Sequence, residues 1–258
     1  MNRTVRRVLY AVGLPVVLIV LWWLLTLGSN SFWVPKPGQL LDTFIKVWIG
    51  PRFMADVVPS LLRLLIGLAI AIVLGIALGL VIGSSLVHRR LSEPVLELFR
   101  AIPPPVLVPI LMVMFGIGDT MKVVVIVFGA VWPILLNTIE GVRAMDEVLS
   151  DTAKVYGIHG ASRVSMLTLP AASPYYIAGI RQALSIGLIL MVISEMFAAT
   201  SGLGFTIVQF QRSFAIPEMW SGIVLLGLIG VALAATFQFF EARILRWYHG
   251  LKEVENSE

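Results

Sequence analysis

Apolar residues in this chain are gathered into long runs, and polar segments with prolines and glycines separate them. The first run, residues 8–28, carries no charged side chain and is long enough to cross a hydrocarbon core of about 30 Å. Further apolar runs follow at about 59–87, 104–118, 121–140, 175–200 and 220–242. The pattern therefore predicts an all-α integral membrane protein with six transmembrane helices in a single domain, residues 1–258.

The third run is the least regular of the six. It is short and opens with Pro103-Pro104-Pro105, so it either borrows preceding residues or forms a broken helix. Gly116-Ile117-Gly118-Asp119 then predicts a tight turn into the fourth run.

Composition and charge agree with a membrane protein. Of 258 residues, 58% are hydrophobic and 13% charged, whereas soluble domains have nearer a quarter charged. The net charge of +4 does not indicate nucleic acid, because the basic residues are scattered between apolar runs. Three basic residues lie in each of the N-terminal segment, the second-to-third connection, the fourth-to-fifth connection and the C-terminal tail, twelve in all; the opposite side has five. The positive-inside rule therefore predicts that both termini are cytoplasmic.

Small residues recur every four positions in the second run, at Gly67, Ala71, Gly75, Gly79 and Gly83. On a helix they form one smooth ridge that lets a neighbouring backbone approach closely. Packing within the chain is the favoured interpretation, and a subunit interface is the alternative.

The sequence offers no site for catalysis. It lacks the Gly-x4-Gly-Lys-Ser/Thr motif that binds ATP phosphates. Its histidines, His88, His159 and His249, lie far apart in polar connections, and it has no cysteine, so neither a metal site nor a cofactor is expected. The chain is therefore not predicted to be an enzyme.

Only Arg63, Arg181 and Glu195 are ionisable residues well inside the runs. Arg181 and Glu195 are 14 positions apart, about 21 Å along a helix, so they cannot pair within one helix. A carboxylate in the membrane is a candidate functional residue. Glu195 is therefore expected either to face the translocation path or to hydrogen-bond a neighbouring helix.

Residues 146–170, here called the polar segment, interrupt the apolar pattern between the fourth and fifth runs. Asp146 is placed to cap a short helix, and Gly157 to end it with a left-handed backbone. A second short helix is expected from about Gly160 until Pro170 stops it. The polar segment thus reads as two short helices bent about a glycine.

The polar segment resembles the cytoplasmic Glu-Ala-Ala-x3-Gly-x9-Ile-x-Leu-Pro loop of ABC importer permeases. The matching positions, at the same spacing, are Asp151, Thr152, Ala153, Gly157, Leu167, Leu169 and Pro170. Most of the chain from Trp33 also resembles the nitrate/sulfonate/taurine-type permeases, on stretches such as "EPVLELFRAIPPPVLVPILMVMFGIGDTMK" and "ISEMFAATSGLGF".

The resemblance implies a multi-pass permease subunit of the bacterial inner membrane. It would pair with a second copy of itself and with two cytoplasmic ATPase subunits, which dock on the seven matching residues. A substrate-binding protein would deliver a small organic or anionic solute, such as a sulfonate or nitrate, from outside. The alternative is a secondary carrier or small channel without an ATPase, and the scarcity of carboxylates in the runs speaks against it.

Overall fold

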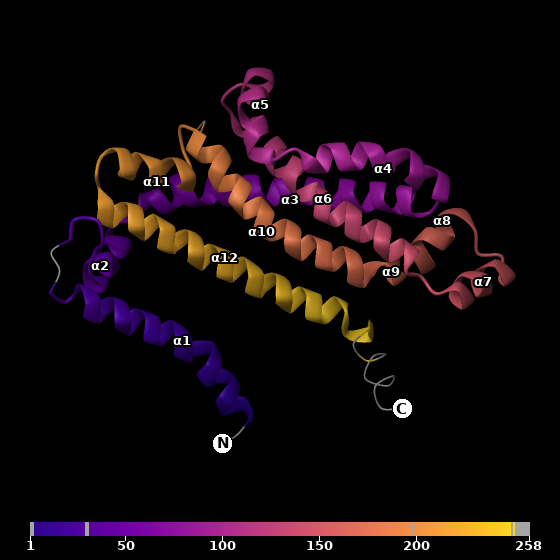
Figure 1. The fold of residues 1–258 in the computed structure, drawn as a ribbon, viewed down its shortest axis with the longest axis horizontal. Coiled ribbons are helices and arrows are strands. Elements are labelled where there is room, and N and C mark those ends of the chain that lie inside the picture. The colour runs from indigo at the N-terminus through magenta and orange to yellow at the C-terminus, as the bar shows by residue number, and fades with distance from the viewer. Residues whose placement is uncertain (1–2, 29–30, 198, 249, 251–258) are drawn as a thin grey trace.

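A computed structural model describes residues 3–28, 31–197, 199–248 and 250, and side chains from Gly13 onward. The regular elements of these residues are all helices, arranged lengthwise in an elongated bundle (Figure 1). In chain order they are α1 (Arg3–Thr26), α2 (Pro37–Trp48), η1 (Phe53–Val57), α3 (Val58–Gly83), α4 (Leu86–Ala101), η2 (Pro104–Leu107), α5 (Val108–Phe115), α6 (Asp119–Arg143), α7 (Glu147–Val155), α8 (Gly160–Arg163), η3 (Val164–Thr168), α9 (Leu169–Ala171), α10 (Ser173–Phe197), α11 (Leu203–Arg212) and α12 (Ile216–Ile244).

Four helices of the described residues are long and apolar enough to cross a membrane: Phe53–Gly83, α6, α10 and α12. A fifth candidate is the pair formed by α4 and η2–α5, which is bent by 80°. The first predicted run coincides with α1, whose described apolar part, Gly13–Thr26, is shorter than a span. The structure thus supports a helical membrane protein with four or five candidate spans, and the six-span topology stays a prediction.

The third predicted run, 104–118, differs most from the structure. The preceding residues, expected to be a connection, form the helix α4, and the chain bends at Ile102-Pro103 before η2 and α5. Proline disfavours helical backbone in the residue before it, and Ile102 is extended, with ψ 117°. The bent pair of α4 and η2–α5 thus contains both features that the sequence left open, helical residues before the run and a break, while its crossing of the membrane as one span stays a prediction.

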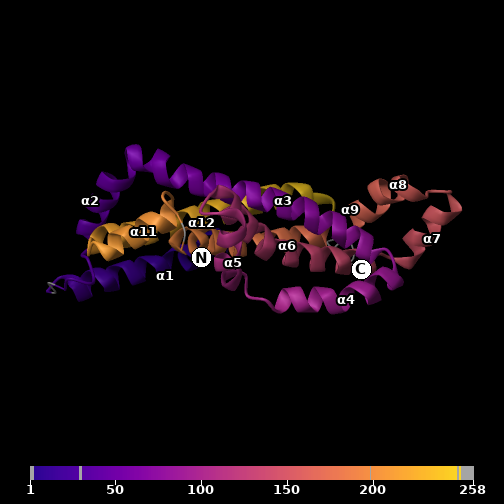
Figure 2. The same cartoon turned by 90° about the horizontal axis from the view of Figure 1, so that it is seen from above.

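The core of the bundle is made by α3, α6 and α10, with Leu64, Ile126, Ile134, Ala183 and Met191 among its buried residues. In Figure 2, α3 and α6 run side by side. The small-residue ridge of α3 faces α6: a Cβ added at Gly75 would lie 2.8 Å from the Ile134 side chain, and one at Gly79 2.5 Å from Thr138. The ridge therefore packs within the chain, and only residues without a larger side chain permit this approach.

A second apolar cluster lies at the end of the bundle where α2, α11 and α12 meet. It is built from Trp48, Val57, Leu203, Phe210 and Leu225. The buried Trp48 Nε1 donates to Ser221 Oγ at 2.9 Å. The short helices α2 and α11, which hydrophobic runs did not predict, are held in place by this cluster.

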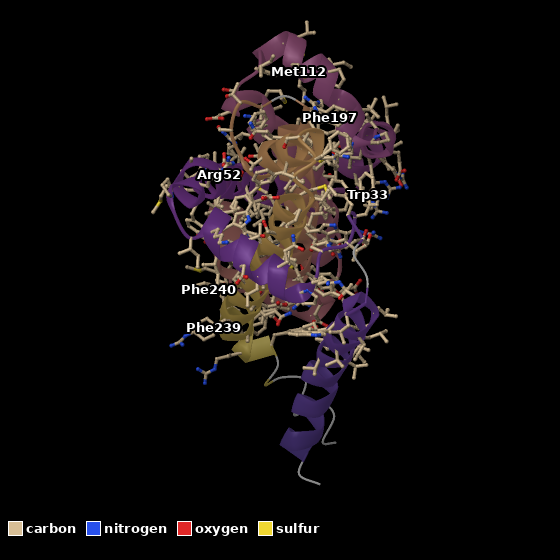
Figure 3. All side chains as sticks on the ribbon, turned by 90° about the vertical axis from the view of Figure 1, so that its left-hand side faces the viewer. Trp33, Arg52, Met112, Phe197, Phe239 and Phe240 are labelled. Atoms are coloured by element: carbon tan, nitrogen blue, oxygen red, sulfur yellow. The ribbon has the colours of Figure 1, made fainter. Side chains whose placement is uncertain are left out.

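The chain itself leaves much of its apolar surface exposed. Figure 3 shows Met112 of α5 and the Phe239–Phe240 pair of α12 at different edges of the bundle. Phe239 is 62% exposed and Val113 of α5 is 89% exposed. Such contiguous apolar faces are expected of a protein that contacts lipid or partner subunits.

Candidate functional site

The polar segment begins with the helix that the sequence predicted. Asp146 caps α7 by accepting the Leu149 N–H at 2.9 Å on its Oδ1. Asp151 accepts from Lys154 Nζ at 2.8 Å, and this bond lowers the pKa of the Asp151 carboxyl. Ala153 is the buried residue of α7, while Tyr156 at its end is exposed.

Gly157 has the left-handed backbone expected of it, with φ +69°. Around it, Ile158 N–H donates to Ala153 O and Gly157 N–H to Lys154 O, the bonding pattern of a Schellman turn. Gly160 is also left-handed, with φ +59°, so the chain reverses between two glycines. Arg163 Nη2 then donates to Ser150 Oγ at 2.7 Å. This bond ties the second arm of the polar segment, the helical residues from Gly160 onward, to the first arm, α7.

The second arm does not stop at Pro170, contrary to the prediction. Helical backbone runs through α8, the π-helical η3 and α9, and the break falls at Ala172, before α10. Proline clashes with the carbonyl four residues earlier in a regular helix. The wider π turn immediately before Pro170 relieves that clash, and η1 stands in the same relation to Pro59.

Six large apolar side chains of the polar segment are exposed, and four of them, Val148, Val155, Tyr156 and Met166, are 72–85% exposed. Among the positions matching the importer loop, Asp151, Thr152, Gly157 and Pro170 are also exposed, and Leu167 and Leu169 are half-buried. The polar segment lies at one end of the bundle, opposite α2 and α11 (Figure 1). Its surface is thus available to a partner at that end.

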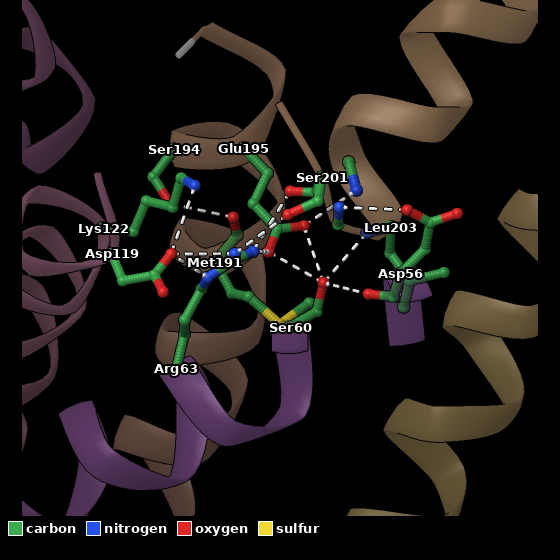
Figure 4. Close-up of polar contacts among 12 residues, drawn as sticks. Asp56, Ser60, Arg63, Asp119, Lys122, Met191, Ser194, Glu195, Ser201 and Leu203 are labelled. Carbon is green, nitrogen blue, oxygen red and sulfur yellow. Dashed lines mark hydrogen bonds and ion pairs between the residues drawn. The ribbon is translucent and has the colours of Figure 1, made fainter. Parts of the chain in front are cut away.

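Glu195 lies at the other end and has no exposed surface. Its Oε1 is 2.6 Å from Arg63 Nη1 and 2.7 Å from Ser60 Oγ, and its Oε2 accepts the Gly204 N–H at 3.0 Å (Figure 4). The carboxylate therefore joins α10 to α3 and to the start of α11.

Further polar groups surround this pair. Arg63 Nε donates to Asp119 Oδ1 at 2.8 Å, and its Nη1 to Ser201 O at 3.2 Å. Lys122, only 3% exposed, places its Nζ 3.6 Å from the same Asp119 oxygen. The two cations and two anions compensate each other, and they connect α6 to the other three helices.

Two glycines after α10 make room for the Glu195 carboxylate. Gly202 has φ +124°, and a Cβ there would overlap the carboxyl group of Glu195. A Cβ at Gly204 would lie 2.5 Å from Val192 O. The absence of side chains at Gly202 and Gly204 therefore lets the backbone lie against the buried carboxylate, and the Gly204 N–H bonds it.

The sequence indicates Arg63 and Glu195 as candidates, but their pairing is not visible in it because they are 132 positions apart. It does not indicate Ser60, Asp119 or Lys122; the only local signal was the glycine-rich stretch after Glu195. Arg181, the third ionisable residue inside the runs, pairs with Glu241 of α12.

Within the described residues, no group of three His, Asp or Glu side chains could hold a metal ion. His88 and His159 are both exposed, and His249 lies outside the described residues.

The sequence profile described as "binding-protein-dependent transport system inner membrane component" matches residues 71–248, more than half of the chain. The chain belongs to this family. It is thus an ABC transporter permease, a multi-pass protein of the inner membrane whose family is non-catalytic, the ATPase being a separate subunit.

Relatives of the permease carry names that state a solute. It is 31% identical over 249 residues to a putative aliphatic sulfonates transport permease protein of Escherichia coli (strain K12), covering 93% of both chains. It is 29% identical to the taurine transport system permease protein of the same strain, covering 94% of this chain and 91% of the other. The nitrate import permease protein of Leptolyngbya laminosa is 28% identical, covering 95% and 90%.

A solved structure shares the fold. An inward-facing form of the MetNI methionine ABC transporter matches with a TM-score of 0.54, covering 81% of this permease and 94% of that chain. At 19% identity, this likeness supports the fold alone.

Proposed function

We propose that the permease is the membrane subunit of an ATP-driven importer, that two copies form the solute passage, and that two cytoplasmic ATPase subunits drive it. A substrate-binding protein would deliver the solute. The names of the relatives, which state taurine, aliphatic sulfonates and nitrate, support a small organic or anionic solute. A twofold pair would also cover part of the exposed apolar surface of α5 and α12.

The polar segment is the observation that carries the proposal. It is rigid for so short a connection, because the Asp146 cap, the turn at Gly157 and the Arg163–Ser150 bond each fix its shape. At the same time it exposes six large apolar side chains. A rigid segment with an uncovered apolar surface suits docking to an ATPase, with Asp151, Thr152, Ala153, Gly157, Leu167, Leu169 and Pro170 as the proposed coupling residues.

Rigidity matters because of how ATP would act. Nucleotide binding on a partner can shift the permease between states only through contacts that differ between those states. A flexible loop would absorb a movement of the ATPase. A segment held in shape by its own hydrogen bonds would pass the movement on to α6 and α10, which flank it.

The alternative, a secondary carrier without an ATPase, draws on the buried residues Arg63, Lys122 and Glu195, with the exposed Asp119 at their edge. Charged clusters of this kind serve proton or ion coupling in carriers. Here Glu195 is fully enclosed and hydrogen-bonded on both oxygens, which supports a role in locking the helices together.

Reconstitution in liposomes tests the two functions against each other. The permease with its ATPase and binding protein should transport solute only when ATP is present on the side of the membrane that carries the ATPase. The isolated permease should hydrolyse no ATP. Solute accumulation by the permease alone, driven by an ion gradient, would establish the carrier instead.

A further inference from the structure

A cavity of about 430 Å³ lies between α4 and α6, and most of its lining is charged. The charged side chains are three arginines and three glutamates: Arg89, Glu93, Glu97, Arg100, Glu140 and Arg143. It is separate from the buried Glu195 cluster, and it is large enough for a small solute.

The two helices that form the cavity run antiparallel. Gly83 at the end of α3 packs on Val142 near the end of α6, and α4 begins three residues after Gly83. The last turn of α4 meets the middle of α6, where the Phe99 ring stacks on Trp132 at 6.3 Å. Arg89 therefore lies at the end of α6 near the polar segment, and Arg100 about 16 Å further along, near the middle of the span.

The depth of Arg100 is its unusual property. Its neighbour Phe99 stacks on Trp132, which stands near the midpoint of the 25-residue helix α6. The Arg100 side chain is nevertheless 52% exposed. An arginine exposed to hydrocarbon at this depth would be very costly, so this face of α4 must border water or a polar occupant.

The arginines retain free hydrogen-bond donors. Arg100 Nη2 is 2.6 Å from Glu97 and Arg143 Nη1 is 2.7 Å from Glu140, each within its own helix. No ion pair of the described residues crosses the cavity. A guanidinium has five N–H donors and never loses its charge, so each of these arginines can bind a planar or tetrahedral oxyanion in addition to its glutamate.

We propose that this cavity is the part of the passage nearest the ATPase and binds the solute as a small oxyanion, first at Arg100 and then at Arg89 and Arg143. This inference rests on the proposed importer function. The three glutamates offset the three arginines, which keeps binding weak, as a site that must release its ligand requires. Arg143 ends α6 only four residues before α7, so movement of the polar segment would reach this end of the cavity directly.

Uptake by the reconstituted complex tests the site. Labelled taurine, nitrate and methanesulfonate are added to the reconstituted wild-type complex. Uptake of the solute that this complex accumulates is then measured for each variant. Arg100→Gln should lower uptake by about tenfold or more, the expected effect of losing a charge-assisted hydrogen bond. Arg90→Gln is the matched control, since Arg90 is an exposed neighbour on α4 that does not line the cavity, and it should stay within about twofold. Equal uptake by Arg100→Gln and wild type overturns the proposal.

Anionic lipid headgroups are a second source of oxyanions. If Arg100 bound lipid instead, Arg100→Gln would reduce uptake only in vesicles containing phosphatidylglycerol and not in pure phosphatidylcholine, which also overturns the proposal. A wild-type complex that accumulates none of the three solutes contradicts the proposed function, whereas the next measurement does not depend on transport.

Cysteine labelling gives that independent measurement, because the chain has no native cysteine. Leu96 lines the cavity one turn from Arg100. Leu96→Cys should react faster with an anionic than with a cationic methanethiosulfonate reagent, and Arg100→Gln should abolish that preference. An unchanged preference in Leu96→Cys/Arg100→Gln would show that Arg100 does not set the charge selectivity of the cavity.

Discussion

Glu195 is a carboxylate with no solvent contact, and its surroundings explain how the fold tolerates it. Burying a lone charge is very unfavourable, but here Arg63 supplies a countercharge, and Ser60 and the Gly204 N–H supply hydrogen bonds. These partners come from two helices, α3 and α11, and Glu195 itself belongs to a third, α10. The residue therefore couples the stability of that end of the permease to a single ion pair.

Glu195→Ala should destabilise the permease by about 3–5 kcal/mol, because it leaves the Arg63 guanidinium buried without its closest countercharge. Glu195→Gln should cost less, since the amide oxygen can still accept from Ser60 and Gly204. Thermal unfolding of the purified protein in detergent measures both, and uptake should fall in the same order.

Glu241→Ala is the control for that series. It also removes the partner of an arginine, but Arg181 has a half-exposed side chain and can regain water. If Glu195→Ala unfolds no earlier than Glu241→Ala, the buried network does not hold the helices together.

The polar segment is the element on which coupling is proposed to depend. Its direction is set by Gly157, whose backbone is left-handed while the space around its Cα is open. A side chain there meets no neighbour, so any effect of substitution comes from the backbone alone. A β-branched residue disfavours this conformation strongly, whereas asparagine tolerates it.

Gly157→Val should leave the spans inserted and weaken docking of the ATPase, because it costs of order 1 kcal/mol or more and redirects the second arm. Co-purification of the ATPase with tagged permease measures docking, and uptake measures coupling. Gly157→Asn is the matched control and should retain most of both. Normal docking and uptake in Gly157→Val would reduce the polar segment to a simple connector.

At the scale of the whole molecule, the polar segment and the α2–α11 end lie at opposite ends of the bundle (Figure 1). The distribution of lysine and arginine predicts that the end with the polar segment is cytoplasmic. Gly202, between α10 and α11, lies in a connection at the opposite end and would be a natural position for a topology probe. It is unsuitable in the fold, because its missing side chain makes room for Glu195.

Single cysteines at exposed serines test the orientation instead. Ser213→Cys, after α11, should react with an impermeant thiol reagent added to intact cells, and Ser162→Cys, in the polar segment, should react only after the cells are opened. The cysteine-free wild type provides the background. The reverse labelling pattern would contradict cytoplasmic placement of the polar segment.

Local patterns in the sequence were sufficient for the long apolar helices of the bundle and for the bend of the polar segment. An apolar run predicts a helix from its own residues, and the Asp146 cap and the left-handed Gly157 depend on neighbours within a few positions. The ridge from Gly67 to Gly83 likewise predicted a close helix contact, because its spacing of four depends only on neighbouring positions. The ridge did not indicate that the helix packed against it is α6.

Tertiary structure alone decided which distant residues meet. Arg63 and Glu195 are paired across 132 positions, and Arg100 faces a cavity shared with Arg143, because helix packing brings those faces together. The helix α4 was not predicted, because the charges in its sequence suggested a connection. A high density of charges indicates contact with water, but it does not tell whether that water lies outside the membrane or in a cavity. Periodicity records only which side of a helix is apolar, and the partner of each side is chosen by the packing of the whole chain.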